Sequence, residues 1–425
     1  MIKCAEEGKF RPVRGTKDLL PDDFYKFDCI RAISQEIGER FGFLPVQTPI
    51  FEAQDVFSKT LGDSTDIIGK EMYTFTDRGG DVLTLRPEFT AAITRLFLTS
   101  GMTVPVRLFT SGPVFRYERP QKCRQRQFHQ INYEFFGAIG SGADAEIISL
   151  AHSILKALGI DDRVTLEINS LGAGSCMGAY KDSLVKYFEK HSDGLSEDSK
   201  RRLYTNPLRI LDTKDPGDIS ILQGAPCIED FYDEDTRHRF CEVKDHLTNL
   251  AIPYVVNNKL VRGLDYYNGV VFEFKTEHLG AQDAVIAGGR YDRLVSLMGG
   301  EDVPAVGFAG GMERLAALMD GGSQGKRFCV AIVPICDEVM PQAMRMAYDL
   351  RLLGLKVAYD HVAVRLKTGL KRADKQGADV VLILGDDELR RGSVTCKHMV
   401  SGRQEEVKTG DIKAYLGKMA AELPK

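Results

Sequence analysis

The stretch that decides the fold begins Pro113-Val-Phe-Arg-Tyr-Glu118 and, after nine loop residues, continues Phe128-His-Gln-Ile-Asn-Tyr-Glu-Phe-Phe136. Successive side chains of a β-strand point to opposite faces, so alternate residues of the second segment share a face. One face is apolar, with Ile131, Tyr133 and Phe135, and the other is polar, with Gln130, Asn132 and Glu134. We therefore expect a hairpin over residues 108–137 whose apolar face packs on a core. The polar face is either solvated or the floor of a ligand site.

The loop of this hairpin is basic, with Arg119, Lys122, Arg124 and Arg126 inside eight residues. Guanidinium groups bind phosphate oxygens through two parallel hydrogen bonds. Cationic loops are equally common on solvated surfaces, and the pattern alone favours neither interpretation. The loop is a candidate phosphate contact.

Two further segments combine polar residues with turn signals. Thr84-Leu-Arg-Pro-Glu-Phe-Thr90 follows a strand pattern, and its proline suits the first position of a helix. Glu88 and Thr90 would then lie in the first helical turn, where a carboxylate either stabilises the helix dipole or binds a substrate ammonium group. Leu260-Val-Arg-Gly-Leu-Asp-Tyr-Tyr-Asn-Gly269 is a charged loop with two tyrosines. Such loops often carry function, although a tyrosine pair can simply be packing.

Two glycine-rich segments complete the set, Gly288-Gly-Arg-Tyr-Asp292 and Ala305-Val-Gly-Phe-Ala-Gly-Gly-Met-Glu-Arg-Leu315. The second predicts a strand, a glycine turn and a helix with Arg314 in its first turn. A helix N-terminus after a glycine turn binds anions readily. The chain has neither the GxxxxGK[ST] phosphate loop nor the GxGxxG spacing of a dinucleotide site at this point.

Periodicity elsewhere predicts a first domain of the α+β class with a mixed sheet. Apolar residues at three- and four-residue spacing predict a helix over residues 22–41. Strand patterns at 72–77 and 82–85 precede a helix pattern at 87–100. The domain comprises residues 1–171 and 251–320, with further strands at 254–256 and 270–275. Residues 172–250 are interpreted as a helical insertion, with helices expected at 181–190, 197–204 and 233–250.

Residues 321–325 form a linker by composition. Beyond it, apolar strands alternate with helices, which predicts a small α/β domain with a parallel sheet over residues 326–425. The expected strands are 328–334, 355–359 and 380–384, and the expected helices are 340–353 and 366–376. Lys367, Lys371 and Lys375 share one face of the last helix, with Arg372 beside them.

Composition limits the class of protein. The chain has 425 residues, 43% hydrophobic and 27% charged, which predicts a soluble protein of several domains. It has no signal-peptide pattern and no apolar run near the ~20 residues that a membrane span needs. Nine dispersed cysteines without a CxxC pair argue against disulfides and a cysteine zinc site. We expect a cytoplasmic protein with no membrane contact.

Residues 326–425 carry a net charge of +5, against −9 for the residues before them. This offset either permits nucleic-acid binding or is a chance surface charge.

In this order the motifs resemble those of the histidyl-tRNA synthetases, a family of class II aminoacyl-tRNA synthetases. The resemblance covers essentially the whole chain. It rests on Arg14-Gly-Thr-Lys-Asp18, Phe43-Leu-Pro-Val-Gln-Thr-Pro49, Phe115-Arg-Tyr-Glu-Arg-Pro120, Arg262-Gly-Leu-Asp-Tyr-Tyr267 and Gly307-Phe-Ala-Gly-Gly-Met-Glu-Arg314. It implies a mainly antiparallel class II catalytic sheet, a C-terminal α/β anticodon-binding domain, and ATP-dependent ligation of histidine to tRNA(His).

The resemblance also implies roles for single residues. The implied catalytic residues are Arg116, which would bind the ATP α-phosphate and the histidine carboxylate, and Arg262, which would stabilise charge on that phosphate. ATP would also contact Arg124 and, at its γ-phosphate, Arg314. The residues implied to bind histidine are Glu88, Thr90 and Gln130 at the ammonium group and Glu134, Tyr266 and Tyr267 at the imidazole. The implied tRNA contacts are Arg119, Gln121, Lys367, Lys371 and Arg372, although a solvated face is the usual interpretation of such a lysine row.

Mg²⁺ accompanying ATP and a homodimer formed near Pro49 are likewise implied, whereas no protein metal site is expected. Cys123 and Phe89 depart from the glycines that many relatives have at these positions. One alternative is an inert paralogue that senses histidine as a regulatory subunit of ATP phosphoribosyltransferase. That family typically lacks the C-terminal domain and parts of the Arg262 motif. A nonenzymatic RNA-binding or stress-sensing module is the second alternative, but it would not need Arg116, Arg262 and Arg314 together.

Overall fold

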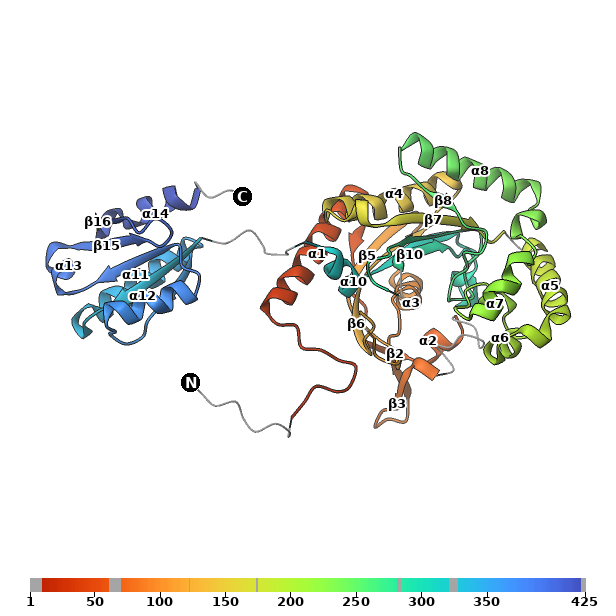
Figure 1. The fold of residues 1–425 in the computed structure, drawn as a ribbon, viewed down its shortest axis with the longest axis horizontal. Helices are drawn as coiled ribbons and strands as arrows, with labels where there is room; N and C mark the ends of the chain where they lie inside the picture. The colour runs from red at the N-terminus through yellow and green to blue at the C-terminus, as the bar shows by residue number, and fades with distance from the viewer. Residues whose placement is uncertain are drawn as a thin grey trace. The chain divides into compact units, whose positions relative to one another are not determined.

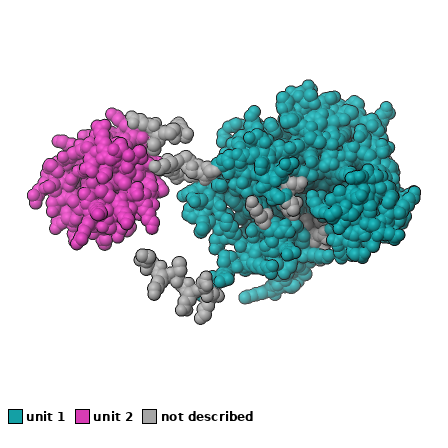
Figure 2. Space-filling model, viewed as in Figure 1, with its two compact units in different colours: residues 1–322 teal, residues 323–425 magenta. Residues whose placement is uncertain are grey.

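A computed structural model of the chain describes residues 10–60, 70–121, 123–172, 175–280, 284–320 and 328–421. The chain divides into two compact units, residues 1–322 and 323–425 (Figure 2). The predicted linker at 321–325 lies outside the described residues, as does Lys122 of the basic loop. Each unit has its own sheet and its own core.

The first unit is built on an eight-stranded sheet. In spatial order the strands are β1 (Leu44–Pro45), β5 (Val106–Phe115), β6 (Gln127–Phe136), β11 (Ala305–Gly311), β10 (Ala284–Arg290), β9 (Val270–Lys275), β7 (Thr165–Ser170) and β8 (Val255–Val256). Only the two outermost pairs are parallel, and the other neighbours are antiparallel. The predicted hairpin is the pair β5–β6, and the mainly antiparallel sheet is confirmed.

The apolar face of β6 packs on the main core, as its alternation predicts. Ile131 and Tyr133 are fully buried there, and the Tyr133 hydroxyl donates to the Ser34 carbonyl at 2.6 Å. Ser34 belongs to α1 (Pro21–Arg40), the predicted first helix. Helix α4 (Ser141–Ala157) contributes further apolar side chains to the same core (Figure 1). This packing leaves the polar face of β6 directed away from the core.

A smaller antiparallel sheet carries the segments before the hairpin. Its order is β2 (Phe51–Ala53), β4 (Val82–Leu85) and β3 (Tyr73–Thr76), with the short α2 (Asp55–Ser58) beside it. The following helix, α3, spans Thr90–Ser100 rather than beginning at Pro87. The expectation that Glu88 lies in its first turn is therefore wrong. Glu88 precedes the helix and caps it.

The segment between β7 and β8 is helical, with α5 (Ser175–Lys190), α6 (Glu197–Arg202), α7 (Pro216–Ile221) and α8 (Glu234–Asn249). Three of these were predicted, and α7 was missed because it begins with Pro216-Gly217, a pair typical of a turn. Figure 1 shows α5, α6 and α7 gathered at one end of the unit. The buried Asp218 carboxylate joins α7 to α6 by accepting hydrogen bonds from Ser196, Ser199 and Thr213.

The second unit has a five-stranded sheet in the order β13 (Lys356–Tyr359), β12 (Cys329–Pro334), β14 (Val380–Leu384), β15 (Ser393–His398) and β16 (Gln404–Lys408). Its helices are α11 (Met340–Leu352), α12 (Leu366–Lys375), α13 (Asp386–Arg391) and α14 (Ile412–Ala421). The first three strands are parallel, but β15 and β16 add antiparallel. The three predicted strands are parallel as expected, whereas β15 and β16 were not predicted, because they lack the continuous apolar run by which the others were recognised.

None of the helices in the described part of the chain is long and apolar enough to cross a membrane.

Candidate active site

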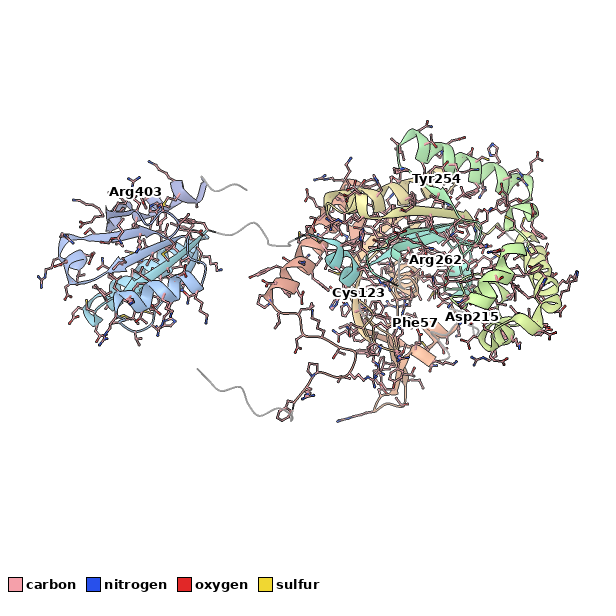
Figure 3. The ribbon with its side chains drawn as sticks, viewed as in Figure 1. Phe57, Cys123, Asp215, Tyr254, Arg262 and Arg403 are labelled. Atoms are coloured by element: carbon pink, nitrogen blue, oxygen red, sulfur yellow. The ribbon has the colours of Figure 1, made fainter. Side chains whose placement is uncertain are left out.

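A cavity of about 610 Å³ lies over the polar face of β6. Nine of the predicted site residues line it: Glu88, Thr90, Arg116, Arg124, Gln130, Arg262, Tyr266, Tyr267 and Arg314. They come from β6, from the loops beside it and at residues 260–269, and from the starts of α3 and α10 (Met312–Leu318). Figure 3 places Arg262 beside the central strands and Cys123 nearer to the hairpin loop. Segments separated by more than two hundred residues thus meet at one site.

Glu134, also a predicted site residue, does not line the cavity itself and is fully buried behind Thr90, which does. Its carboxylate accepts one hydrogen bond from the Thr90 hydroxyl at 2.5 Å and another from the Tyr291 hydroxyl. Burial is the main cause that raises the pKa of Glu134 to about 8. A carboxylate desolvated in this way gains strongly from a ligand that donates to it.

Gln130 and Asn132, on the same strand face, each have a buried amide oxygen without a partner in the part of the chain that the structure describes. Among the described residues, neither Oε1 of Gln130 nor Oδ1 of Asn132 has a hydrogen-bond partner. The Asn132 amide group donates to the Phe308 carbonyl at 3.3 Å. Buried polar atoms are normally hydrogen-bonded, so these two oxygens point to a ligand with N–H groups. The polar face of β6 is therefore not a solvated surface, and two of its acceptors are available to a ligand.

The register of the sheet makes room for Glu134. Gly307 on β11 lies directly opposite Glu134 on β6. A Cβ atom at Gly307 would stand 1.9 Å from Oε2 of Glu134. Any larger residue would displace the carboxylate, which gives the first glycine of the Arg314 motif a specific function.

Three tyrosines stand around the same carboxylate. The Tyr266 ring lies 4.6 Å from that of Tyr267 and 5.6 Å from that of Tyr291, measured between centroids. Tyr291 was not predicted as a site residue, although the Gly288–Asp292 segment had been noted. Its contact with Glu134 depends on strand register, which the sequence does not display. A flat polar ring would fit against these aromatic faces.

Glu88 acts as the cap of α3. Its two carboxylate oxygens accept the backbone N–H groups of Thr90 at 2.6 Å and Ala91 at 2.7 Å. The structural explanation given for this residue is thus correct, and the same carboxylate also lines the cavity. A carboxylate has about four lone-pair sites, so capacity for a ligand ammonium group remains.

Four guanidinium groups surround the cavity. Arg116 donates to the Pro87 carbonyl at 2.9 Å, Arg314 donates to the Ala284 carbonyl at 2.5 Å, and Arg124 pairs with Glu118. Burial lowers the pKa of Arg116. This concentration of cations favours a ligand with several negative charges.

Arg262 is the fourth guanidinium and pairs with Glu273 on β9. Burial opposes its charge, but Glu273 and the neighbouring tyrosines raise the pKa of Arg262 above its usual value. Its Nε is buried without a partner among the described residues. Arg262 is therefore charged and held in place, with donor capacity left for a ligand.

The hairpin loop closes on itself through backbone bonds between Gln121 and Arg124. Cys123 between them has a φ of 58°, in the left-handed region. Glycine adopts this conformation without steric cost, which explains why a cysteine here is a departure. Cys123 and Arg124 line the cavity, whereas Arg119 and Gln121 are exposed and do not.

Sequence reasoning missed several lining residues. Glu313 accepts the backbone N–H of His129 at 3.0 Å and also contacts its ring. The insertion contributes the segment from Arg209 to Lys214 to the cavity wall.

The implied tRNA contacts Lys367, Lys371 and Arg372 are exposed on α12 of the second unit. Cys336, Glu338 and Asp386 form a group of potential metal ligands within the described residues, and they lie in that unit, not at the cavity.

The mixed sheet, its ligand floor and the arginines around it define the catalytic domain of a class II aminoacyl-tRNA synthetase. The histidyl-tRNA synthetase family model matches residues 15–174 and 209–315, and an anticodon-binding domain model matches residues 329–419. The histidine–tRNA ligase of Anaplasma phagocytophilum is 66% identical over 98% of this chain and 99% of that protein. The Ehrlichia canis histidine–tRNA ligase is 52% identical over 96% and 98%.

A solved structure agrees with these sequences. The apo Staphylococcus aureus histidyl-tRNA synthetase matches with a TM-score of 0.80 and 32% identity, over 96% of this chain and 99% of that one. The chain belongs to the histidyl-tRNA synthetase family.

Proposed function

We propose that this chain activates L-histidine with ATP and then transfers it to the 3′ end of tRNA(His). In the first step a histidine carboxylate oxygen attacks the α-phosphorus of ATP. Histidyl-adenylate forms and pyrophosphate leaves. In the second step a 3′-terminal ribose hydroxyl attacks the acyl carbon and AMP leaves. The proposal rests mainly on one observation: four guanidinium groups and a set of buried hydrogen-bond acceptors line the same cavity.

The arginines would bind the phosphate groups of ATP and stabilise the negative charge that develops during the reaction. Arg116 binds the α-phosphate and the histidine carboxylate, Arg124 and Arg314 bind ATP, and Arg314 meets the γ-phosphate. Arg262 stabilises the charge that builds on the α-phosphate during attack. The carboxylate is already ionised, so the step needs positioning and charge stabilisation more than a base. The unpartnered Nε of Arg262 supports this assignment.

Histidine would lie on the polar face of β6. Glu88, Thr90 and Gln130 hold its ammonium group, with the unpartnered Oε1 of Gln130 as one acceptor. Glu134, Tyr266 and Tyr267 recognise the imidazole. A site built to hydrogen-bond a substrate rejects analogues without those groups by about 10⁴–10⁵-fold. Such discrimination needs no separate editing step.

The remaining partners follow from the same chemistry. Mg²⁺ would arrive with ATP and be held mainly by phosphate oxygens, as is usual for this ion. Glu313, beside Arg314 in the cavity wall, can supply a carboxylate to it. The exposed Lys367, Lys371 and Arg372, with Arg119 and Gln121, would contact tRNA phosphates. We further propose a cytoplasmic homodimer formed around Pro49.

The regulatory alternative has no support. The Arg262 motif is intact and pairs with Glu273, and the chain retains the second unit with its anticodon-binding match. A histidine sensor would need the ligand floor but not the four arginines. The ligase therefore accounts for the whole cavity.

ATP–pyrophosphate exchange on the purified chain, with each amino acid tested separately, examines the activation step. We expect exchange with histidine alone. Folded protein that binds histidine but supports exchange with no amino acid would contradict the proposal and restore the sensor.

A further inference from the structure

The loop that carries Arg262, residues 260–269, is fixed by the sheet at both of its ends. The Asn169 side chain on β7 donates to the Leu260 carbonyl at 3.0 Å. At the other end, the backbone N–H of Asn268 donates to the Arg290 carbonyl at 2.8 Å. These contacts determine where the loop begins and ends, but they leave its middle to other interactions.

The helical insertion contacts the middle of this loop. The amide nitrogen of Asn206 donates to Oδ1 of Asp265 at 2.8 Å. Nearby, the Arg209 guanidinium lies against Gly263, where an added Cβ would stand 3.0 Å from Nη1. Asn206 is buried, with 7% of its surface exposed. Asp265 is exposed, so this hydrogen bond connects a carboxylate of the loop to a donor whose own position is fixed by burial.

Asn206 is itself rigidly placed. Its backbone N–H donates to the Arg202 carbonyl at 2.8 Å, and its carbonyl accepts from Arg209 at 3.0 Å. The turn that follows, Pro207–Ile210, buries Ile210 completely in the main core. The buried Asp218 ties the neighbouring Thr213 to the same helices. The position of Asn206, which donates the hydrogen bond to Asp265, is therefore fixed by the packing and hydrogen bonds of the insertion.

We propose that Asn206 is a positioning residue for amino-acid activation. Through Asp265 it holds the 260–269 loop so that Arg262 faces the α-phosphate and the two tyrosines face histidine. The insertion is then a structural part of the active site. This inference rests on the proposed function, because it assigns Asn206 to that reaction.

Asn206→Ala tests the inference in ATP–pyrophosphate exchange. We expect kcat/KM for histidine to fall about tenfold, the effect of losing one hydrogen bond to a carboxylate. The fall should combine a lower kcat with a higher KM for histidine, while KM for ATP stays within about twofold. Asn206→Asp keeps the shape but turns the donor into a second carboxylate, so it should be at least as impaired. Thr205→Ala, at the exposed neighbouring position, is the control and should remain like the wild type.

A double variant separates the contact from general damage. If Asn206 acts through Asp265, Asp265→Ala added to Asn206→Ala should be no worse than the more severe single variant. Additive losses would mean that the two residues act independently and would overturn the inference. Kinetics like the wild type in both Asn206 variants would overturn it as well.

Hydrogen exchange provides a readout that does not depend on activity. In Asn206→Ala the backbone amides of residues 261–268 should exchange faster, with those of α8 unchanged. Faster exchange throughout α5–α8 would make Asn206 a stabiliser of the insertion and overturn its positioning role. If the wild type shows no histidine-dependent ATP–pyrophosphate exchange, the proposed function fails. The hydrogen-exchange rates of residues 261–268 in Asn206→Ala would still decide whether Asn206 holds the loop.

Discussion

Replacing Glu134 with glutamine tests how the site recognises histidine. Glu134 is fully buried and accepts from the hydroxyls of Thr90 and Tyr291. Glutamine has the same shape, and hydroxyls can both donate and accept, so the fold should tolerate it. What is lost is an ionised acceptor for the imidazole N–H. A hydrogen bond to a charged group is worth about 1.5–3 kcal/mol, which corresponds to a fall of about 10- to 150-fold in kcat/KM for histidine.

The pH profile makes this prediction sharper. The pKa of Glu134 in the free protein is about 8, against an ordinary value of 4.5, because burial disfavours its charged form. The carboxylate therefore forms as the pH rises toward and through 8. Since kcat/KM reports groups of the free enzyme, its value for histidine should rise over this range in the wild type. The rise should be absent in Glu134→Gln.

The assay is ATP–pyrophosphate exchange between pH 6 and about 9, with histidine and ATP each varied, a window that spans the raised pKa. KM for ATP should change by less than about twofold, because Glu134 lies on the histidine floor. Glu146→Gln is the control, since Glu146 on α4 pairs with Arg107 on β5 and does not line the cavity. Equal losses for histidine and ATP, or a variant that keeps the rise with pH, would refute the reasoning.

Three further predictions concern the phosphates, the glycine opposite Glu134 and the RNA surface. Arg262→Ala should lower kcat of the exchange reaction by about 10²–10³-fold with little change in KM for ATP, because the lost donor acts on charge that develops during attack. Gly307→Ala should raise KM for histidine at least tenfold (on the order of 1.4 kcal/mol), because the new methyl group would overlap the Glu134 carboxylate, and histidine titrations measure this directly. Replacing Lys367 and Lys371 with alanine should reduce the salt slope of tRNA binding by about two, one for each lost phosphate contact.

Each of these has a clear contrary result. An Arg262 variant with unchanged kcat and a raised KM for ATP would assign that residue to ground-state binding. Gly142→Ala is the control for the glycine, because nothing lies within 4 Å of an added Cβ there. If it impairs histidine use as much as Gly307→Ala does, crowding of Glu134 is not the cause. An unchanged salt slope would leave the lysine row as a solvated face.

The local features of the site could be predicted from the sequence because they depend on short-range periods. The two-residue alternation of β6 separates Ile131 from Gln130 and Glu134 without any knowledge of the fold. Helix α1 and strand β14 follow equally directly from apolar spacing. The family resemblance then supplied the order of the motifs, which alternation alone does not contain.

Features that depend on strand register could not be predicted. Tyr291 and Glu134 are 157 residues apart in sequence, and the pairing of β10 with β11 and of β11 with β6 brings them together. The start of α3 was misjudged because Pro87 is a general helix signal, whereas the Glu88 carboxylate fixes the cap. The insertion gave no sequence signal that it would reach the Arg262 loop through Asn206.

The proposed reaction ends with histidine joined to tRNA(His). The most direct test is the charging of tRNA(His) transcript by the full chain with ATP and labelled amino acids. We expect histidine to be attached to the 3′ end of tRNA(His) by an ester that is stable to acid and cleaved by alkali, at a rate that depends on ATP, with no charging by other amino acids. Histidine-dependent pyrophosphate exchange without any transfer to tRNA would contradict it.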